Sequence, residues 1–149
     1  MWSWCRKRPY GHPKKDTLLF PFFRYTIVSG KSPMKITRLY TGRDNHSYFE
    51  DIEVSFDPKG PLGLFSEPIG AKAVFFREIP PGYVYPWHNV VCREYVVTLD
   101  GKAEIEAGSG EKRRFGKGDV LLAEDVTGKG HQTRAIGRKS WRQIFVTLP

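Results

Sequence analysis

The sequence predicts a single all-β domain, and three observations support this fold class. Apolar and polar residues alternate with period two in several segments from Met34 onward, as in strands that bury one face. Glycine and proline are frequent (15 and 11 of 149 residues), and aromatic residues make up 14% of the chain, which suits short strands joined by tight turns. No segment has the periodicity of a long amphipathic helix.

About ten strands are expected, an ordinary number for a closed or two-sheet β architecture. The alternation is strict in residues 51–57, where Ile52, Val54 and Phe56 share one face, so this strand is predicted to be half buried. Residues 58–70 are rich in Gly and Pro and are predicted to form a long loop. The other expected strands are residues 35–40, 72–79, a segment ending near His88, 93–99, 102–107, 111–115, 119–123, 132–136 and 141–147.

The residue types at one turn give a specific prediction of how two strands pair. Asp100 and Gly101 tolerate the positive φ angles of a type I′ turn. They lie between two predicted strands, residues 93–99 and 102–107, so the sequence predicts that these strands form a hairpin.

Charge divides the chain into two parts. Residues 1–33 contain seven Lys or Arg and one Asp without helical or strand periodicity, so they are predicted to be a basic, poorly ordered N-terminal extension. A basic arm that contacts a membrane surface or an acidic partner is the alternative for this segment. Residues 34–149 hold 17 basic and 15 acidic residues and form the predicted domain. This near balance argues against a nucleic-acid-binding surface on the domain, despite the formal net charge of +8.

Other features exclude further classes of protein. Cys5 and Cys92 show no pairing pattern, which argues against a disulfide framework. No apolar run approaches the roughly 20 residues that a membrane helix needs, and the start of the chain has no small-residue cleavage site behind an apolar segment. A reduced, cytoplasmic setting without a membrane partner is therefore expected.

A motif in the middle of the chain identifies a family likeness. Five residues separate Gly82 from His88, Val90 stands two positions after His88, Glu94 follows four positions later, and Gly101 closes the stretch. This spacing resembles the first motif of the cupins, which runs Gly, five residues, His, one residue, His, three or four residues, Glu, six residues, Gly. The sequence departs from the motif at Val90, where cupins usually carry a second metal-binding histidine.

A second stretch resembles the second cupin motif. Gly118 opens it, Glu124 replaces the usual proline, and the expected histidine is delayed by two positions to His131. The resemblance to small, uncharacterised single-domain cupins implies a cupin β-barrel, or double-stranded jelly roll, over residues 34–149.

The resemblance also implies a site. His88 and Val90 share one strand face, and Glu94 shares a face with Val96 on the next strand. If His131 enters from the opposite strand, two imidazoles and one carboxylate converge inside the barrel. His88, Glu94 and His131 are then the predicted metal ligands, and Fe, Mn, Ni or Zn would fit such a set. A shift of the strand by one residue would instead turn Arg93 inward.

Two functions stay open at this stage. The first is a mononuclear metal-dependent enzyme, of the oxygenase or isomerase type, that acts on a small molecule in the barrel cavity. The second is a non-catalytic, metal-free module that binds a small molecule in the same cavity, because Val90 removes a ligand. The resemblance further implies that the chain could form a homodimer.

Overall fold

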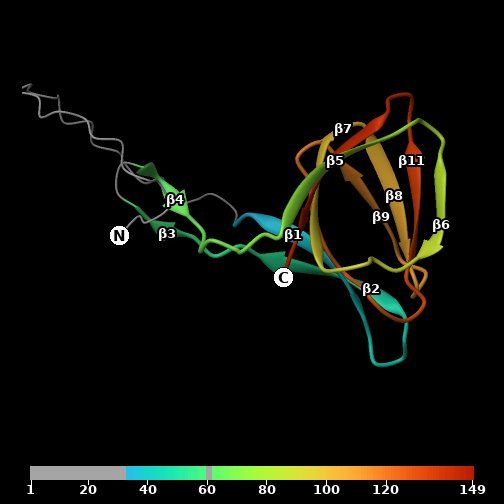
Figure 1. Cartoon of the computed structure of the whole chain (residues 1–149), viewed down its shortest axis with the longest axis horizontal. Helices are drawn as coiled ribbons and strands as arrows, with labels where there is room; N and C mark the ends of the chain where they lie inside the picture. The colour runs from blue at the N-terminus through green and yellow to red at the C-terminus, as the bar shows by residue number, and fades with distance from the viewer. Residues whose placement is uncertain (1–32, 60–61) are drawn as a thin grey trace, which may run out of the picture.

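The computed structural model describes residues 33–59 and 62–149, and this part of the chain consists of strands and connecting loops (Figure 1). The predicted N-terminal extension, residues 1–33, lies almost wholly outside the described residues, and Cys5 lies wholly outside them. The strands are β1 (Lys35–Thr41), β2 (Ser47–Glu53), β3 (Asp57–Pro58), β4 (Leu64–Phe65), β5 (Ala73–Ile79), β6 (Val84–His88), β7 (Glu94–Asp100), β8 (Lys102–Ala107), β9 (Lys112–Gly116), β10 (Val120–Glu124), β11 (His131–Ile136) and β12 (Trp141–Thr147).

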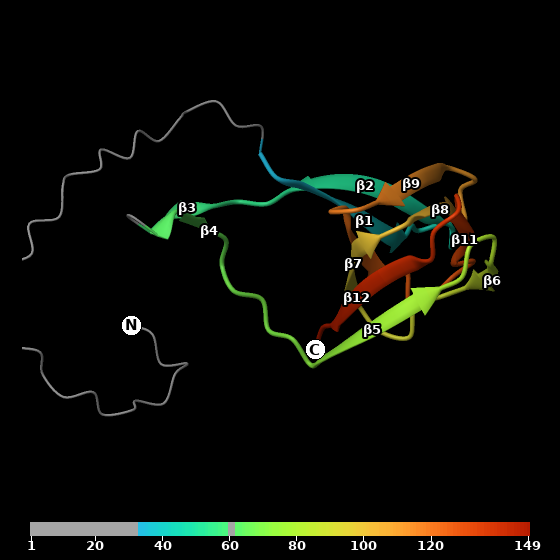
Figure 2. The ribbon, with the colours of Figure 1, turned by 90° about the horizontal axis from the view of Figure 1, so that it is seen from above.

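Two sheets face each other and confirm the predicted all-β jelly-roll class. The large sheet has the strand order β2-β1-β10-β7-β12-β5, and the small sheet has the order β6-β11-β8-β9. No ladder joins the edge strands of the two sheets in the described residues, so the barrel is not closed by hydrogen bonds. Figure 2 shows the two layers from above, with the short β3–β4 hairpin projecting away from them.

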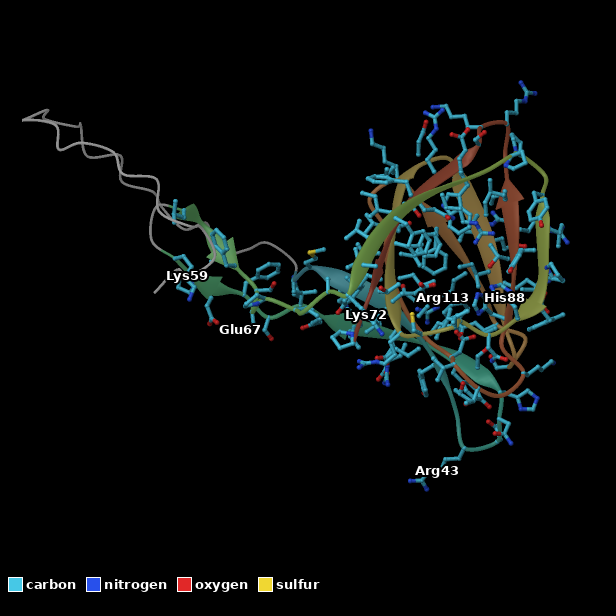
Figure 3. All side chains as sticks on the ribbon, in the orientation of Figure 1. Arg43, Lys59, Glu67, Lys72, His88 and Arg113 are labelled. Carbon is cyan, nitrogen blue, oxygen red and sulfur yellow. The ribbon has the colours of Figure 1, made fainter. Side chains whose placement is uncertain are left out.

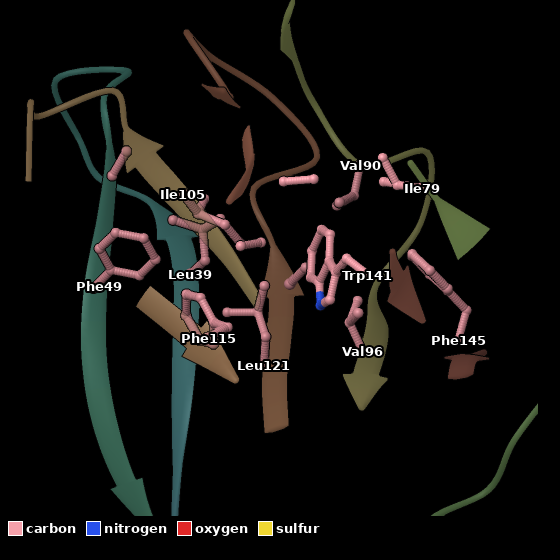
Figure 4. Close-up of a cluster of buried hydrophobic side chains, with 14 residues drawn as sticks. Leu39, Phe49, Ile79, Val90, Val96, Ile105, Phe115, Leu121, Trp141 and Phe145 are labelled. Atoms are coloured by element: carbon pink, nitrogen blue, oxygen red, sulfur yellow. The ribbon is translucent and has the colours of Figure 1, made fainter. Parts of the chain in front are cut away.

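The hydrophobic core lies between the sheets because alternate residues of each strand point inward. Leu39 of the large sheet and Ile105 of the small sheet are both buried almost completely in one cluster (Figure 4). The cluster comprises Leu39, Phe49, Ile79, Val90, Val96, Ala103, Ile105, Ala107, Phe115, Leu121, Ala123, Ala135, Trp141 and Phe145. The Trp141 indole N–H donates a hydrogen bond of 3.1 Å to the Thr98 hydroxyl, which satisfies the one polar atom of that buried ring.

The predicted strand at residues 51–57 is displaced towards the N-terminus, since β2 occupies Ser47–Glu53. Of the predicted apolar face, Ile52 and Val54 are partly buried, whereas Phe56 lies outside β2 and is 38% exposed. Ile52 and Val54 pack against Ile36 and Leu122 on the side of the large sheet that faces away from the small sheet. The predicted loop over residues 58–70 contains the β3–β4 hairpin, which is too short for period-two patterning to reveal.

The prediction that the strands around Asp100-Gly101 form a hairpin is wrong. β7 pairs with β10 and β12 in the large sheet, whereas β8 pairs with β11 and β9 in the small sheet. Gly101 does have a positive φ of 76°, and an added Cβ would lie 2.3 Å from the Ser140 carbonyl oxygen. The glycine therefore serves a tight corner at which the chain changes sheets.

Two findings concern the disulfide framework and the membrane helix that the sequence argues against. Cys92 carries a free thiol. In the described part of the chain, no helix has the length and apolar character that a membrane crossing requires.

Gly130 gives a direct test of the packing beside β11. Its φ is +69°, and an added Cβ would lie 2.1 Å from the His88 carbonyl oxygen on β6. Gly130→Ala should therefore lower the free energy of unfolding by more than about 2 kcal/mol, measured by urea denaturation. Gly118→Ala is the matched control, because its φ is +92° but nothing lies within 4 Å of the added Cβ. It should cost about 1 kcal/mol, and equal losses in the two variants would contradict the packing described here.

Candidate functional site

A cavity of about 470 Å³ opens between the two sheets near residues 89–92. This volume is within the usual range for small-molecule sites. Its walls combine side chains from β5, β6, β7, β8, β10, β11 and β12 with those of the loop after His88. The lining residues are Phe75, Arg77, Tyr85, His88, Asn89, Val90, Val91, Cys92, Glu94, Val96, Ile105, Leu121, Ala123, His131, Thr133, Trp141, Phe145 and Thr147.

The two predicted histidines lie side by side in this cavity. His88 on β6 is the direct register partner of His131 on the neighbouring strand β11, and their ring centroids are 4.2 Å apart. The imidazoles thus converge from adjacent strands of the small sheet and not from opposite strands. Figure 3 labels His88, which lies beside β11. The rings of His88 and Tyr85 also make a T-shaped contact, with their centroids 4.2 Å apart.

Both rings are held through their Nδ1 atoms. His88 Nδ1 lies 2.8 Å from the carbonyl oxygen of Pro86, and because a carbonyl only accepts, Nδ1 donates. His131 Nδ1 donates in the same way to the Asp125 carboxylate at 2.7 Å. In each ring Nε2 is the nitrogen that remains for a ligand. Burial lowers the pKa of His88, and the neighbouring His131 lowers it further, so His88 is neutral at pH 7 and its Nε2 is an acceptor.

Asp125 is a functional candidate that the sequence reasoning did not single out. Its side chain is fully buried (0% exposed), and only its Oδ2 atom has a partner, which is His131. The backbone around it is also fixed, because the Asn89 amide donates to the Asp125 carbonyl at 3.0 Å. A carboxylate that orients an imidazole in this way sets the tautomer and the direction of the ring. The available signal was an acidic residue directly after the apolar strand β10.

Glu94 faces the cavity from the large sheet, as predicted. Arg93 points the other way and pairs with Glu124 at 2.6 Å, so the register shift that would turn Arg93 inward does not occur. Burial raises the pKa of Glu94 above its ordinary value of 4.5, although Arg77 and His131 partly oppose this change. The site therefore holds a carboxyl group with increased affinity for a proton.

The side-chain arrangement bears on whether these residues could hold a metal ion. Val90, which replaces the usual histidine, is a buried core residue that lines the cavity. Within residues 33–59 and 62–149, no group of three or more His, Cys, Asp and Glu side chains is arranged to hold a metal ion. The residues present therefore do not supply a three-residue ligand set. The metal role of His88, Glu94 and His131 stays a prediction.

Arg77 on β5 is the second residue that the sequence reasoning missed. Its guanidinium lies 4.9 Å from the centre of the Tyr85 ring, a cation–π contact. Its backbone pairs with β12, but among the described residues its guanidinium takes part in no hydrogen bond and in no ion pair within 4 Å. An arginine in a cavity wall whose five N–H donors are not used by the protein is available to a ligand. Its position in an alternating strand gave no indication of this role.

Comparisons with known proteins place this geometry in context. No family model matches the chain. Phomopsin biosynthesis cluster protein D of Diaporthe leptostromiformis is 32% identical over 89 residues, which is 59% of this chain and 44% of that protein. The chain spans less than half the length of the curated relatives that it matches.

Two solved structures are similar to part of the chain. A cupin 2 conserved barrel domain protein from Salinispora arenicola is 18% identical, with a TM-score of 0.45, and the match covers 65% of this chain and 75% of that one. A protein with a double-stranded β-helix domain from Klebsiella pneumoniae is 21% identical, with a TM-score of 0.44, covering 51% and 65%.

The pH dependence of stability tests the environment of Glu94. Because the folded-state pKa is raised, the folded chain keeps this proton over a pH range in which the unfolded chain, with a pKa near 4.5, has released it. The contribution of Glu94 to stability is thus complete below pH 4.5 and is lost as pH rises through the folded-state pKa. Relative to the wild type, Glu94→Gln should gain stability on going from about pH 4 to about pH 8, measured by urea denaturation at each pH.

The control for this experiment is Glu67→Gln, at an exposed position outside the cavity. It should leave the difference from the wild type nearly constant with pH. If the free energy of unfolding of Glu94→Gln changed with pH in parallel with that of the wild type, this carboxyl group would not be in the buried environment described above.

Proposed function

We propose that this cupin-type barrel binds a small organic acid in the cavity between its sheets, and that the acid carries a hydroxyl or amino group. The observation that carries the proposal is Arg77, a cation in the cavity wall that the described protein residues leave without a hydrogen-bond or ion-pair partner. Planar carboxylates are the groups that an arginine fork binds best, through two parallel N–H···O bonds.

The histidines supply the second recognition element. With Nδ1 used as a donor, the neutral His88 ring offers Nε2 as an acceptor, and the Nε2 atom of His131 lies on the other side of a ring that is anchored by Asp125. A ligand hydroxyl or amine that donates to these nitrogens would be favoured over a purely apolar group. The proposed ligand is therefore a hydroxy acid or an amino acid.

The remaining wall suits the carbon skeleton of such a molecule. Val96, Leu121 and Phe145 line the cavity with apolar surface, and Phe75 stacks on Phe145 with ring centroids 4.8 Å apart. An aromatic or branched aliphatic body would bury its surface here. The names of the curated relatives, which are biosynthesis cluster proteins, are consistent with a role connected to small molecules.

The metal-dependent enzyme is the less favoured function, because the described residues lack a three-residue ligand set. Metal analysis after expression in metal-replete medium decides this point. Near-stoichiometric Fe, Mn, Ni or Zn that disappears in His88→Ala and His131→Ala would favour the metal-dependent enzyme over the metal-free binding module.

Calorimetric titration with mandelate, an aromatic hydroxy acid, tests the proposed function. Mandelate should bind with a dissociation constant below about 1 mM, and Arg77→Met should weaken binding at least tenfold, roughly the loss of one charge-assisted pair. Arg43→Met is the matched control, because Arg43 is exposed on the β1–β2 loop outside the cavity (Figure 3), and should leave binding unchanged.

Two ligand analogues separate the recognition elements. Methyl mandelate lacks the charge that Arg77 would meet, and phenylacetate lacks the hydroxyl that would donate to the histidines, so both should bind more weakly than mandelate. The proposal fails if none of the three compounds binds, or if Arg77→Met binds mandelate as the wild type does.

A further inference from the structure

A row of three polar side chains crosses the inner face of the large sheet. Gln143 on β12 is the register partner of Arg77 on β5 and of Thr98 on β7, so the three side chains point between the sheets from neighbouring strands. Gln143 also alternates along β12 with Trp141 and Phe145, which both line the cavity and are labelled in Figure 4. The cavity wall thus continues into a polar row beside Arg77.

The carboxamide of Gln143 is the unexplained group in this row. Gln143 is 1% exposed, and neither its Nε2 atom nor its Oε1 atom has a hydrogen-bond partner among the described residues. Both register partners have other contacts, because Thr98 accepts from the Trp141 indole at 3.1 Å and Arg77 lies over the Tyr85 ring. A buried donor and a buried acceptor without partners both cost free energy, so a partner from outside the described chain is expected.

The other recognition groups of the cavity lie close to this amide. The Arg77 guanidinium lies 4.9 Å from the centre of the Tyr85 ring, and the centroid of the His88 ring lies 4.2 Å from that of Tyr85. Arg77 and His88 therefore contact the same aromatic ring. Gln143 does not itself line the cavity, but its three side-chain torsions can turn the amide towards a ligand at Arg77 without a change of the backbone.

The number of acceptors distinguishes the two ligand classes that the proposed function leaves open. The neutral His88 ring offers Nε2 and the Gln143 amide offers Oε1, so two acceptors are available to the group that lies beside the ligand carboxylate. A hydroxyl has one hydrogen to donate and can satisfy only one of these acceptors. An ammonium group has three hydrogens and can satisfy both.

The charges of the cavity wall favour the same class. Apart from the two histidines, the ionisable acids and bases that line the cavity in the described chain with a carboxylate or a guanidinium are one acid, Glu94, and one base, Arg77. A hydroxy acid carries only the carboxylate that Arg77 would bind, whereas an amino acid zwitterion carries one charge of each sign. Its ammonium group would lie in a cavity that also holds Glu94, and would favour the ionised form of that carboxyl group.

We infer that the ligand is an α-amino acid, and that Gln143 is the residue that selects it over the corresponding hydroxy acid. This inference rests on the function proposed above, since it takes the ligand carboxylate to lie at Arg77. In this arrangement the ammonium group donates to His88 Nε2 and to Gln143 Oε1. The apolar wall at Phe75 and Phe145 would bury an aromatic or branched side chain of the amino acid.

Calorimetric titration at pH 7 with phenylglycine, the amino counterpart of mandelate, tests the inference. The wild type should bind phenylglycine at least about tenfold more tightly than mandelate, because the ammonium group makes a further charge-assisted hydrogen bond. Gln143→Leu keeps the approximate size of the side chain and removes its amide. This variant should weaken phenylglycine at least about tenfold and mandelate less, so that the two compounds bind with similar affinity.

Gln132→Leu is the matched control, because Gln132 lies on β11 between two buried residues and does not line the cavity. It should keep the preference for phenylglycine. Circular dichroism verifies the fold of each variant, and Gln143→Leu should unfold at a higher urea concentration than the wild type, because it removes a buried amide without partners. If Gln143→Leu were misfolded, Gln143→Met is the second variant, with the same expected loss of preference.

The outcomes separate this inference from the proposed function. Binding of mandelate without a preference for phenylglycine would overturn the inference and leave the proposed function standing. A preference that Gln143→Leu retains would overturn the inference as well, because the amide would then be partnered by a buried water molecule and not by the ligand. If neither compound binds, the proposed function fails and the inference fails with it.

Discussion

The buried hydrogen bond between Asp125 and His131 is the interaction on which the site depends. A carboxylate with no exposed surface has lost its hydration, so a strong partner is needed to keep it inside the protein. His131 Nδ1 is that partner at 2.7 Å, and the bond determines which ring nitrogen remains for a ligand. It also fixes the direction of the ring, because Asp125 is held in turn by Asn89 through its carbonyl group.

The backbone around this pair brings the remaining groups into place. Gly130 packs against the His88 carbonyl, and its own carbonyl accepts a hydrogen bond from the buried Ser47 hydroxyl at 2.7 Å. This close approach sets His131 beside His88 in register. The large sheet supplies Glu94 and Arg77 from β7 and β5, so the polar side of the cavity is shared by both sheets. Because Val90 belongs to the core, the polar groups in the cavity wall include one guanidinium and two imidazoles, from Arg77, His88 and His131. The rest of the wall is largely apolar.

Local patterning predicted the strands well, because period-two alternation is a property of each strand by itself. It could not tell which side of a sheet an apolar face would lie on. Ile52 and Val54 alternate as core residues do, yet they lie on the side of the large sheet that faces away from the small sheet. Asp100 and Gly101 are residue types typical of a hairpin turn, but turn residues do not determine whether the next strand joins the same sheet. His88, Glu94 and His131 were found through motif spacing and do line one cavity. Asp125 and Arg77 belong to no motif, and only the packing of distant strands brings them to the site.

The tautomer of His131 is the most direct test of the account. Long-range ¹H–¹⁵N NMR spectra of the EDTA-treated protein at pH 7 distinguish a protonated from an unprotonated ring nitrogen. The account predicts that Nδ1 of His131 carries a proton, and that this assignment is lost in Asp125→Ala. A His131 ring protonated only at Nε2, or one that exchanges freely between both tautomers, would contradict the anchoring by Asp125 and with it the proposed arrangement of the cavity.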